Sequence, residues 1–321
     1  MDLTLIIIIF LILSILIAIG IGANDETFSI VYGSRILTMK QILILAAILA
    51  IAGALLLGEG VAKTVGNSIL NYEATEAIVI TILLSTAIWL ILASALGLPI
   101  STTHATIGSI MGIGIFVWGM TGLNWGMILY MAMWWILSPI VGFVGTYVAY
   151  KILFKYKQKR LKGFQDYESY EMKFAVIVLI AICITAFSRA GNDCSNAVGI
   201  VIGVGDMDIG FLLIITGLSL ACGLVILGRV VIVNLGEMTE LRPSTAFAAQ
   251  IPTAVIMLIG TIQKIPLSGS HMLVASLVGL AKASKTPMKK GLWKIILIWF
   301  LTFPMSALLA IILYFPVSLF F

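Results

Sequence analysis

Charged side chains are scarce in this sequence of 321 residues. Asp, Glu, Lys and Arg together make up 10% of the chain, whereas hydrophobic residues make up 61%. A soluble domain carries roughly 25% charged residues, so a soluble fold of this length would expose much apolar surface to water. The composition therefore excludes a cytosolic enzyme and a nucleic-acid-binding protein, and it indicates a polytopic membrane protein.

Cysteine and histidine are also rare. Cys183, Cys194 and Cys222 all lie in apolar sequence, and their odd number argues against a disulfide framework, so we expect small core residues. His104 and His271 are the only histidines. Because no cysteine or carboxylate lies near them at metal-ligand spacing, we expect them to orient a hydroxyl group or to bond across helices. The sequence predicts no cofactor, and no metal beyond a coupling cation.

Uncharged runs define the predicted membrane segments. These runs are 3–24, 41–58, 77–150, 174–188, 209–228, 243–263, 265–281 and 295–321. The first lacks the basic start of a signal peptide, so we interpret it as a membrane helix. The run 77–150 is long enough for three crossings, which gives ten in total, five on each side of a central loop. The short segments 99–118 and 265–281 are either full spans or re-entrant hairpins.

Basic residues gather in two segments. Residues 151–173 hold seven and residues 282–294 hold five, which is 12 of the 19 in the chain. Cytoplasmic loops are enriched in Lys and Arg, so both segments are predicted to face the cytoplasm. With ten crossings, both termini then lie outside a cell membrane.

Two motifs occur once in each half of the chain. Residues 22–25 read Gly-Ala-Asn-Asp and residues 190–193 read Ala-Gly-Asn-Asp, while 98–104 and 265–271 share a Pro, a hydroxyl cluster and a final His. An odd number of crossings per half would invert one half relative to the other, as in many secondary transporters. We therefore predict an all-α membrane protein of two inverted repeats, 1–153 and 174–321. They are joined by a basic cytoplasmic loop, 154–173, and have broken or re-entrant helices at the motifs.

The Asn-Asp motifs are candidate cation sites. Asn24-Asp25 and Asn192-Asp193 interrupt apolar sequence beside a glycine, and a buried carboxylate needs protein, water or an ion as partner. Carboxylate, amide and freed carbonyl oxygens are suitable ligands for Na⁺. The alternative is that these residues only cap helix ends. Glu26 adjoins Asp25 and either carries a proton, ligates a cation or faces a watery vestibule.

The hydroxyl clusters are candidate anion sites. Ser101, Thr102 and Thr103 follow a proline that is predicted to open a helix, and first-turn amides with nearby hydroxyls favour an oxyanion. Ser268, Gly269 and Ser270 form the corresponding cluster in the second half. The two clusters are expected to face one tetrahedral oxyanion from opposite sides. The alternative is that they only bond helix to helix.

Other polar residues allow a structural interpretation. Arg35 and Arg189 are expected near the membrane faces, where their side chains reach the interface, although either would attract an anion. Residues 237–244 predict a cytoplasmic loop with Ser244 or Thr245 capping the next helix, or a segment beside the site.

With these motifs, the chain resembles the inorganic phosphate transporter family. The resemblance rests on the paired Asn-Asp motifs, the paired Pro-hydroxyl-His motifs and residues 236–249. It implies transport of inorganic phosphate with Na⁺ or H⁺. It also implies that Asn24, Asn192 and Asn196 line a shared site with the two aspartates and the hydroxyl clusters.

Three positions depart from the family pattern. Glu26 stands where the family has Val, Phe28 where it has Asn, and Gly269 where it has Thr. The first half has therefore lost an amide and gained a carboxylate, and the second half has lost a hydroxyl. We expect threonine to be tolerated at position 269.

The leading hypothesis is a Na⁺- or H⁺-coupled phosphate symporter that works by alternating access. Its alternatives are a permease for sulfate or a related oxyanion, H⁺-coupled through Glu26, a channel, and an intramembrane aspartyl protease that uses the Gly-x-Gly-Asp motif at 203–206. The expected partners are the lipid bilayer, the substrate, the coupling ion and, in one alternative, a second copy of the chain.

Overall fold

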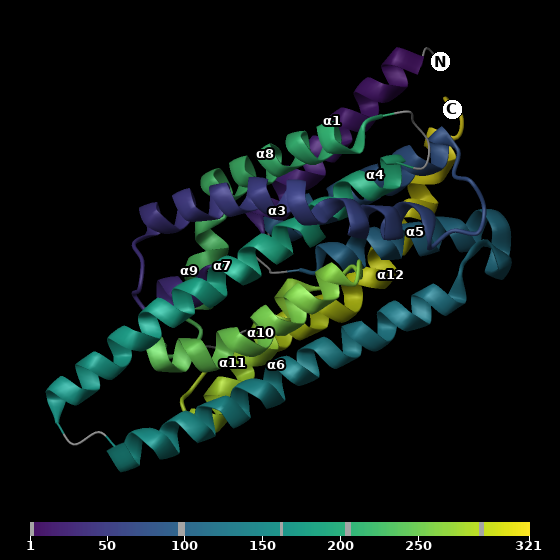
Figure 1. Ribbon diagram of the computed structural model, residues 1–321. Coiled ribbons are helices and arrows are strands. Elements are labelled where there is room, and N and C mark those ends of the chain that lie inside the picture. Colours follow the sequence, from purple (N-terminus) through teal and green to yellow (C-terminus); the bar gives the residue numbers. More distant parts are fainter. Residues whose placement is uncertain (1–2, 96–99, 161–162, 203–206, 289–291) are drawn as a thin grey trace.

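The computed structural model describes residues 3–95, 100–160, 163–202, 207–288 and 292–321, and these fold into packed helices (Figure 1). The helices are α1 (Leu3–Ala23), α2 (Ser29–Gly33), α3 (Met39–Asn67), α4 (Glu76–Ala95), α5 (Thr102–Trp118), the 3₁₀ turn η1 (Gly119–Gly122), α6 (Trp125–Arg160), α7 (Phe164–Ile202), α8 (Ile209–Leu227), α9 (Arg229–Gly236), α10 (Pro243–Ile262), α11 (Gly269–Ser284) and α12 (Leu292–Val317). Within the described ranges, nine helices are long and apolar enough to cross a membrane. The fold class is therefore the predicted all-α polytopic membrane protein.

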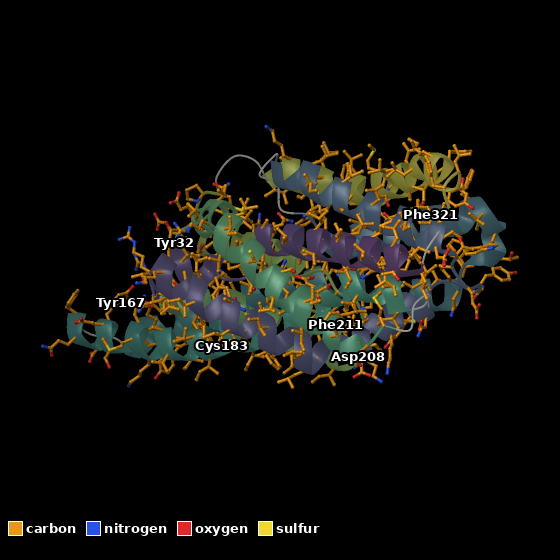
Figure 2. All side chains as sticks on the ribbon, turned by 90° about the horizontal axis from the view of Figure 1, so that it is seen from above. Tyr32, Tyr167, Cys183, Asp208, Phe211 and Phe321 are labelled. Atoms are coloured by element: carbon orange, nitrogen blue, oxygen red, sulfur yellow. The ribbon has the colours of Figure 1, made fainter. Side chains whose placement is uncertain are left out.

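The bundle has two distinct ends. Both termini lie at one end, here called the terminal end, and α6 and α7 join at the opposite end, here called the basic end (Figure 1). Tyr32 and Tyr167 lie toward the basic end and Phe321 toward the terminal end (Figure 2). At the basic end, Lys157 pairs with Glu171 at 3.3 Å. Both termini therefore lie at the end opposite to the basic segment (Figure 1), and the side of the membrane that each end faces stays a prediction.

Two helix pairs form hairpins that enter from opposite ends. The α4–α5 pair begins and ends at the terminal end, where Leu70 and Leu123 form a β-bridge just outside it. The α10–α11 pair begins and ends at the basic end, where the Thr239 and Thr286 hydroxyls lie 3.1 Å apart. The segments 99–118 and 265–281 were predicted as either full spans or re-entrant hairpins, and the structure has hairpins. The prediction of ten crossings is therefore wrong for α4, α5, α10 and α11. The long helices α1, α3, α6, α7, α8 and α12 run between the two ends.

Packing partners exchange between the two halves of the chain. α1 packs on α8 and α7 packs on α3; α5 packs on α12 and α11 packs on α6. α4 packs on α1 and α12, and correspondingly α10 packs on α7 and α6. This pattern is expected when α1, α3, α4, α5 and α6 are the repeat counterparts of α7, α8, α10, α11 and α12. It supports the predicted inverted repeat.

Glycines allow two of these helix pairs to make backbone contact. A Cβ atom on Gly22 would overlap the carbonyl oxygen of Leu220, and one on Gly66 would overlap that of Gly199. Small residues at a crossing let apolar membrane helices approach closely, which increases their van der Waals contact. Gly22 and Gly66 therefore let α1 approach α8 and α3 approach α7 closely.

The two Asn-Asp motifs differ in backbone structure. α1 ends at Ala23 and α2 begins at Ser29, so the predicted break at Asn24-Asp25 is present. α7 continues through Asn192-Asp193 to Ile202, so the predicted break there is wrong. Gly191 instead allows α7 to pack closely on α3, because a Cβ atom at this position would lie 2.7 Å from the carbonyl oxygen of Gly53 in α3.

The basic segment 154–173 is largely helical, although it was expected as a loop. α6 runs to Arg160 and α7 begins at Phe164. Two contacts join the two helices: Lys157 donates a hydrogen bond to Glu171, and the Tyr156 ring stacks on the Tyr170 ring. The domain boundaries at 153 and 173 stay predictions.

Candidate functional site

The turning segments of the two hairpins meet inside the bundle. Thr103 donates a hydrogen bond to the Leu267 carbonyl at 2.8 Å, and Ser270 donates one to the Ile100 carbonyl at 3.1 Å. Thr103 and Ser270 occupy equivalent places in the repeat, as do Ile100 and Leu267. Each hairpin therefore satisfies a backbone carbonyl of the other, and the starts of α5 and α11 are held side by side.

Each inward-facing helix begins with a serine cap. The Ser101 hydroxyl accepts the His104 amide at 3.1 Å, and the Ser268 hydroxyl accepts the His271 amide at 3.4 Å. Both serines are therefore occupied as N-caps. The amides of the first helical turn remain free of helical bonds and give each helix start a positive character that suits an anion.

Three asparagines anchor these helix starts. The Asn24 amide donates to the Ile100 carbonyl at 3.3 Å, and the Asn192 amide donates to the Ile265 carbonyl at 2.7 Å. The amide of Asn196 donates to Thr103 at 3.3 Å. We expect Asn24 and Asn192 to bind the anion and Asn196 to bind the cation, and all three contact residues at or just before the starts of α5 and α11.

Three buried carboxylates surround the guanidinium of Arg189. Its Nε atom lies 2.9 Å from Asp193, and its Nη1 atom lies 2.7 Å from Glu26 and 3.4 Å from Asp25. Nη1 also donates to Thr27 at 3.1 Å. The arginine is 4% exposed, so its position near a membrane face, expected from the sequence, is wrong. The paired acids explain why the charge is stable there, since buried ions require close partners.

Arg189 is the residue of this cluster that the sequence did not assign to the site. The available signal was its spacing, because Arg189 precedes Asp193 by one helical turn and shares its face. Arg35, in contrast, is exposed at the start of the segment between α2 and α3, as expected for an interfacial residue.

Gly269 provides the space that Arg189 occupies. A Cβ atom on Gly269 would lie 2.6 Å from Nε and 2.8 Å from both Cδ and Cζ of Arg189. At the repeat counterpart, Thr102 keeps its side chain and donates to Asp193 at 3.2 Å. We expected threonine to be tolerated at 269, but its side chain would overlap the guanidinium unless Arg189 moves.

Several buried oxygens beside this cluster lack a hydrogen-bond donor among the described residues. They are Oδ1 of Asn24, Oε2 of Glu26 and Oδ1 of Asn196, and each residue is at most 1% exposed. Carboxylate and amide oxygens of this kind are hard ligands suited to Na⁺. Asp25, Asp193, Glu26 and Asn196 stay the predicted cation ligands.

The two histidines lie against each other. The centres of the His104 and His271 rings are 4.6 Å apart in an edge-to-face arrangement, and Trp135 and Trp299 pack beside them. Among the described residues, no Cys, Asp or Glu joins the two histidines in a group that could hold a metal ion. The histidines contact each other across helices, and nothing in their surroundings provides a third ligand.

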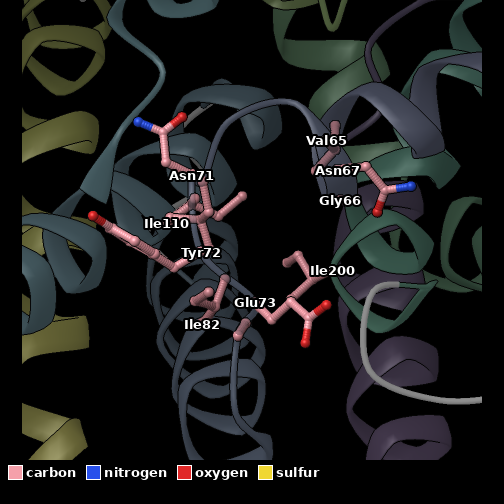
Figure 3. A pocket seen from close by; sticks show the side chains of 11 residues that line it. Val65, Gly66, Asn67, Asn71, Tyr72, Glu73, Ile82, Ile110 and Ile200 are labelled. Atoms are coloured by element: carbon pink, nitrogen blue, oxygen red, sulfur yellow. The ribbon is translucent and has the colours of Figure 1, made fainter. Parts of the chain in front are cut away.

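Pockets open at both ends of the bundle, away from these motifs. One of about 320 Å³ at the terminal end is lined by Asn67, Tyr72 and Glu73 (Figure 3). Another of about 620 Å³ at the basic end is lined by residues including Arg35 and Glu240. The carboxylates and hydroxyls of the central cluster line neither pocket. The cluster itself is buried in this conformation: Glu26, Asp193 and Arg189 are at most 4% exposed, and Asp25 is 9% exposed.

Residues 237–244 lie at the basic end. Ser244 donates its amide and its hydroxyl to Glu171, each at 2.8 Å, and Thr245 accepts the Arg242 amide at 2.8 Å. The N-cap of α10 is Arg242, so the prediction that Ser244 or Thr245 caps this helix is wrong; both lie in its first turn, where Thr245 bonds back to Arg242 and Ser244 bonds the acid of α7. Asp206 of the Gly-x-Gly-Asp motif lies outside the described residues, as do Leu98 and Pro99.

Comparisons with known proteins agree with this geometry. A family model described as the phosphate transporter family matches residues 21–310. A protein of Thermococcus kodakarensis named "putative phosphate permease" is 26% identical, with 95% of this chain and 97% of that protein covered. A sulfate permease of Bacillus subtilis is 28% identical over 85% of this chain and 77% of its own length.

One solved structure has the same fold. It is described as the sodium-dependent phosphate transporter, and it superposes with a TM-score of 0.86, 24% identity and coverage of 98% of this chain and 100% of its own. The family match spans the paired Asn-Asp motifs and the paired hydroxyl motifs, which are the residues that meet in the centre of the bundle. The chain belongs to the phosphate transporter family.

Proposed function

We propose that this chain is a secondary active symporter that couples the movement of inorganic phosphate to Na⁺ by alternating access. The observation that carries the proposal is the meeting of two hairpin turns beside three buried carboxylates and one guanidinium. The helix starts provide amide and hydroxyl donors for a tetrahedral oxyanion. The neighbouring carboxylate and amide oxygens provide ligands for a small cation.

The proposed ligands fall into two sets. The phosphate set comprises Thr102, Thr103, Gly269 and Ser270, with Asn24 and Asn192, while Ser101 and Ser268 hold the helix starts as caps. The cation set comprises Asp25, Asp193, Asn196 and Glu26. The sets touch where Thr102 donates to Asp193. This contact supports coupling, because binding in one set changes the partners available to the other.

The arrangement of hairpins supports alternating access. The hairpins enter from opposite ends, and pockets at both ends stop short of the buried cluster. A small movement of one hairpin and its packing partners relative to the other would connect the cluster to one end at a time.

Uptake into proteoliposomes tests the proposal. Labelled phosphate is supplied while a Na⁺ gradient and a pH gradient are imposed separately. We expect the inward Na⁺ gradient to drive accumulation and Asp193→Asn to abolish it. Asp208→Asn is the matched control, because Asp208 is exposed at the terminal end and caps α8, and asparagine is also a good cap.

Two other results would change the assignment. Accumulation driven by the pH gradient alone would assign the coupling to H⁺, with Glu26 as the candidate carrier. Unsaturable uptake that follows neither gradient would indicate a channel and would contradict the proposal.

Sulfate is the second candidate substrate. The observation in its favour is the sulfate permease among the relatives, which covers 85% of this chain. The same liposomes with unlabelled sulfate as competitor distinguish the two. Stronger competition by sulfate than by phosphate would make sulfate the substrate.

A further inference from the structure

One N–H group of the Arg189 guanidinium has no hydrogen-bond partner among the described residues, and it belongs to the nitrogen that contacts the first turn of α11. A guanidinium has five N–H groups. Nε donates to Asp193, Nη1 donates to Glu26 and Thr27, and Nη2 donates to Ser270 at 3.3 Å. The second hydrogen of Nη2 has no partner among the residues that the structure describes. It lies beside Ser270, in the first turn of α11.

Charge balance indicates what this donor binds. Three carboxylates and one guanidinium form the cluster, so negative charges exceed positive charges by two when all four groups are ionised. An oxyanion would be repelled by this cluster unless a positive group faced it. Helix starts contribute only partial charges, whereas Arg189 contributes a full charge in a planar fork that matches two oxygens of an oxyanion.

Resting on the proposed function, we propose that Arg189 is the charged ligand of the transported oxyanion and that the carboxylates and the anion compete for it. The anion takes hydrogen bonds from the Nη2 edge, next to Ser270. The coupling cation takes over carboxylate oxygens that the guanidinium gives up. The cation neutralises the carboxylates that the guanidinium gives up, and the anion neutralises the guanidinium that the cation frees. Binding of each ion therefore favours binding of the other.

The geometry distinguishes this role from simple charge compensation for Glu26. If Arg189 only neutralised Glu26, removing both residues would leave the site's net charge unchanged and would restore binding. If Arg189 binds the anion, the double variant retains the charge balance but lacks the ligand. The double variant Glu26→Gln/Arg189→Gln therefore separates the two roles.

Binding of labelled phosphate to the purified full-length protein at saturating Na⁺ is the measurement. We compare wild type, Arg189→Gln, Arg189→Lys, the double variant and the control Arg229→Gln, in which an exposed arginine of α9 is replaced. Loss of a charged hydrogen-bonding partner corresponds to at least about a tenfold weakening. We expect this weakening in Arg189→Gln and in the double variant, and a smaller one in Arg189→Lys, which keeps the charge but not the fork.

Binding of labelled Na⁺ to the same proteins provides the second readout. We expect Arg189→Gln to retain Na⁺ binding or to strengthen it, because the carboxylates lose a competing cation. Phosphate binding of wild-type strength in the double variant would overturn the inference and leave the proposed function intact. Failure of the wild-type protein to bind either phosphate or sulfate would remove the proposed function together with the inference.

Discussion

Gly269 offers a direct test of how tightly the central cluster is packed. In Gly269→Ala, the new Cβ atom would lie 2.6 Å from Nε of Arg189, whereas ordinary contacts are 3.4–4 Å. The guanidinium must therefore shift by about 1 Å. The shift lengthens the 2.9 Å bond between Nε and Asp193 beyond hydrogen-bond range.

The magnitude follows from the bond that is lost. A hydrogen bond to a charged group contributes about 1.5–3 kcal/mol, and a buried ion left without its partner costs more. We expect Gly269→Ala to lower the free energy of unfolding by about 2–3 kcal/mol and Gly269→Thr to lower it further. Movement of the other side chains of the cluster would reduce the loss of stability, and the range given already allows for this movement.

A double-mutant cycle isolates the contact. Unfolding free energies of the detergent-solubilised protein are measured for Gly269→Ala, Arg189→Gln and the combination. We expect the alanine to cost little once Arg189 is replaced, because glutamine is shorter and flexible. Gly126→Ala is the control, since a Cβ atom there meets nothing closer than 3.5 Å. Equal losses for Gly269→Ala in both backgrounds would refute the proposed contact.

Three further predictions follow from the same arrangement. Thr103→Val and Ser270→Ala each remove a hydrogen bond between the hairpins, so each should lower the free energy of unfolding by about 1 kcal/mol and weaken phosphate binding. Thermal melts and binding assays on the same samples measure both effects. An unchanged melting temperature would show that these bonds do not hold the hairpins together. Asp193→Asn should keep the protein folded while it abolishes Na⁺-driven accumulation, and full accumulation would remove Asp193 from the cation set. Cysteines introduced at Gln158 and Asp208 should be labelled from opposite sides of the membrane, whereas labelling from the same side would contradict the orientation.

Much of the fold follows from patterns that are local in the sequence. Uncharged runs locate the membrane helices, because a charge in hydrocarbon is costly. The prolines before Ser101 and Ser268 locate the starts of α5 and α11, although we expected both serines to bind the anion and the structure has them as N-caps. The repeat is visible because both motifs recur at nearly the same spacing, and it predicts that the two hydroxyl clusters lie together, which they do.

Other features depend on contacts that hydropathy does not encode. A hairpin and two spans have the same apolar composition, so the turn of α4–α5 back to the terminal end was undecided from the sequence. The glycine before Asn192 suggested a helix break, but in the fold it allows α7 to contact α3. Arg189 resembled an interfacial residue because its acidic partners Asp25 and Glu26 lie more than 160 residues away in the chain.

Two departures from the family pattern, Glu26 and Gly269, lie directly against Arg189. On one side of the site the family's donors are present. Thr102 of the first half of the chain donates to Asp193, and Asn196 of the second half donates to Thr103. The counterparts of these donors are Gly269 and Phe28, and neither side chain can donate a hydrogen bond.

Arg189 replaces both of these missing donors. Its Nη1 atom lies 3.4 Å from Asp25, and its Nη2 atom donates to Ser270 at 3.3 Å. Glu26, at 2.7 Å, offsets the charge of Arg189. Threonine at 269 alone would crowd the guanidinium without removing it, because a Cβ atom there already lies 2.6 Å from Nε. We therefore expect Gly269→Thr to weaken the site unless Arg189 and Glu26 are replaced with it.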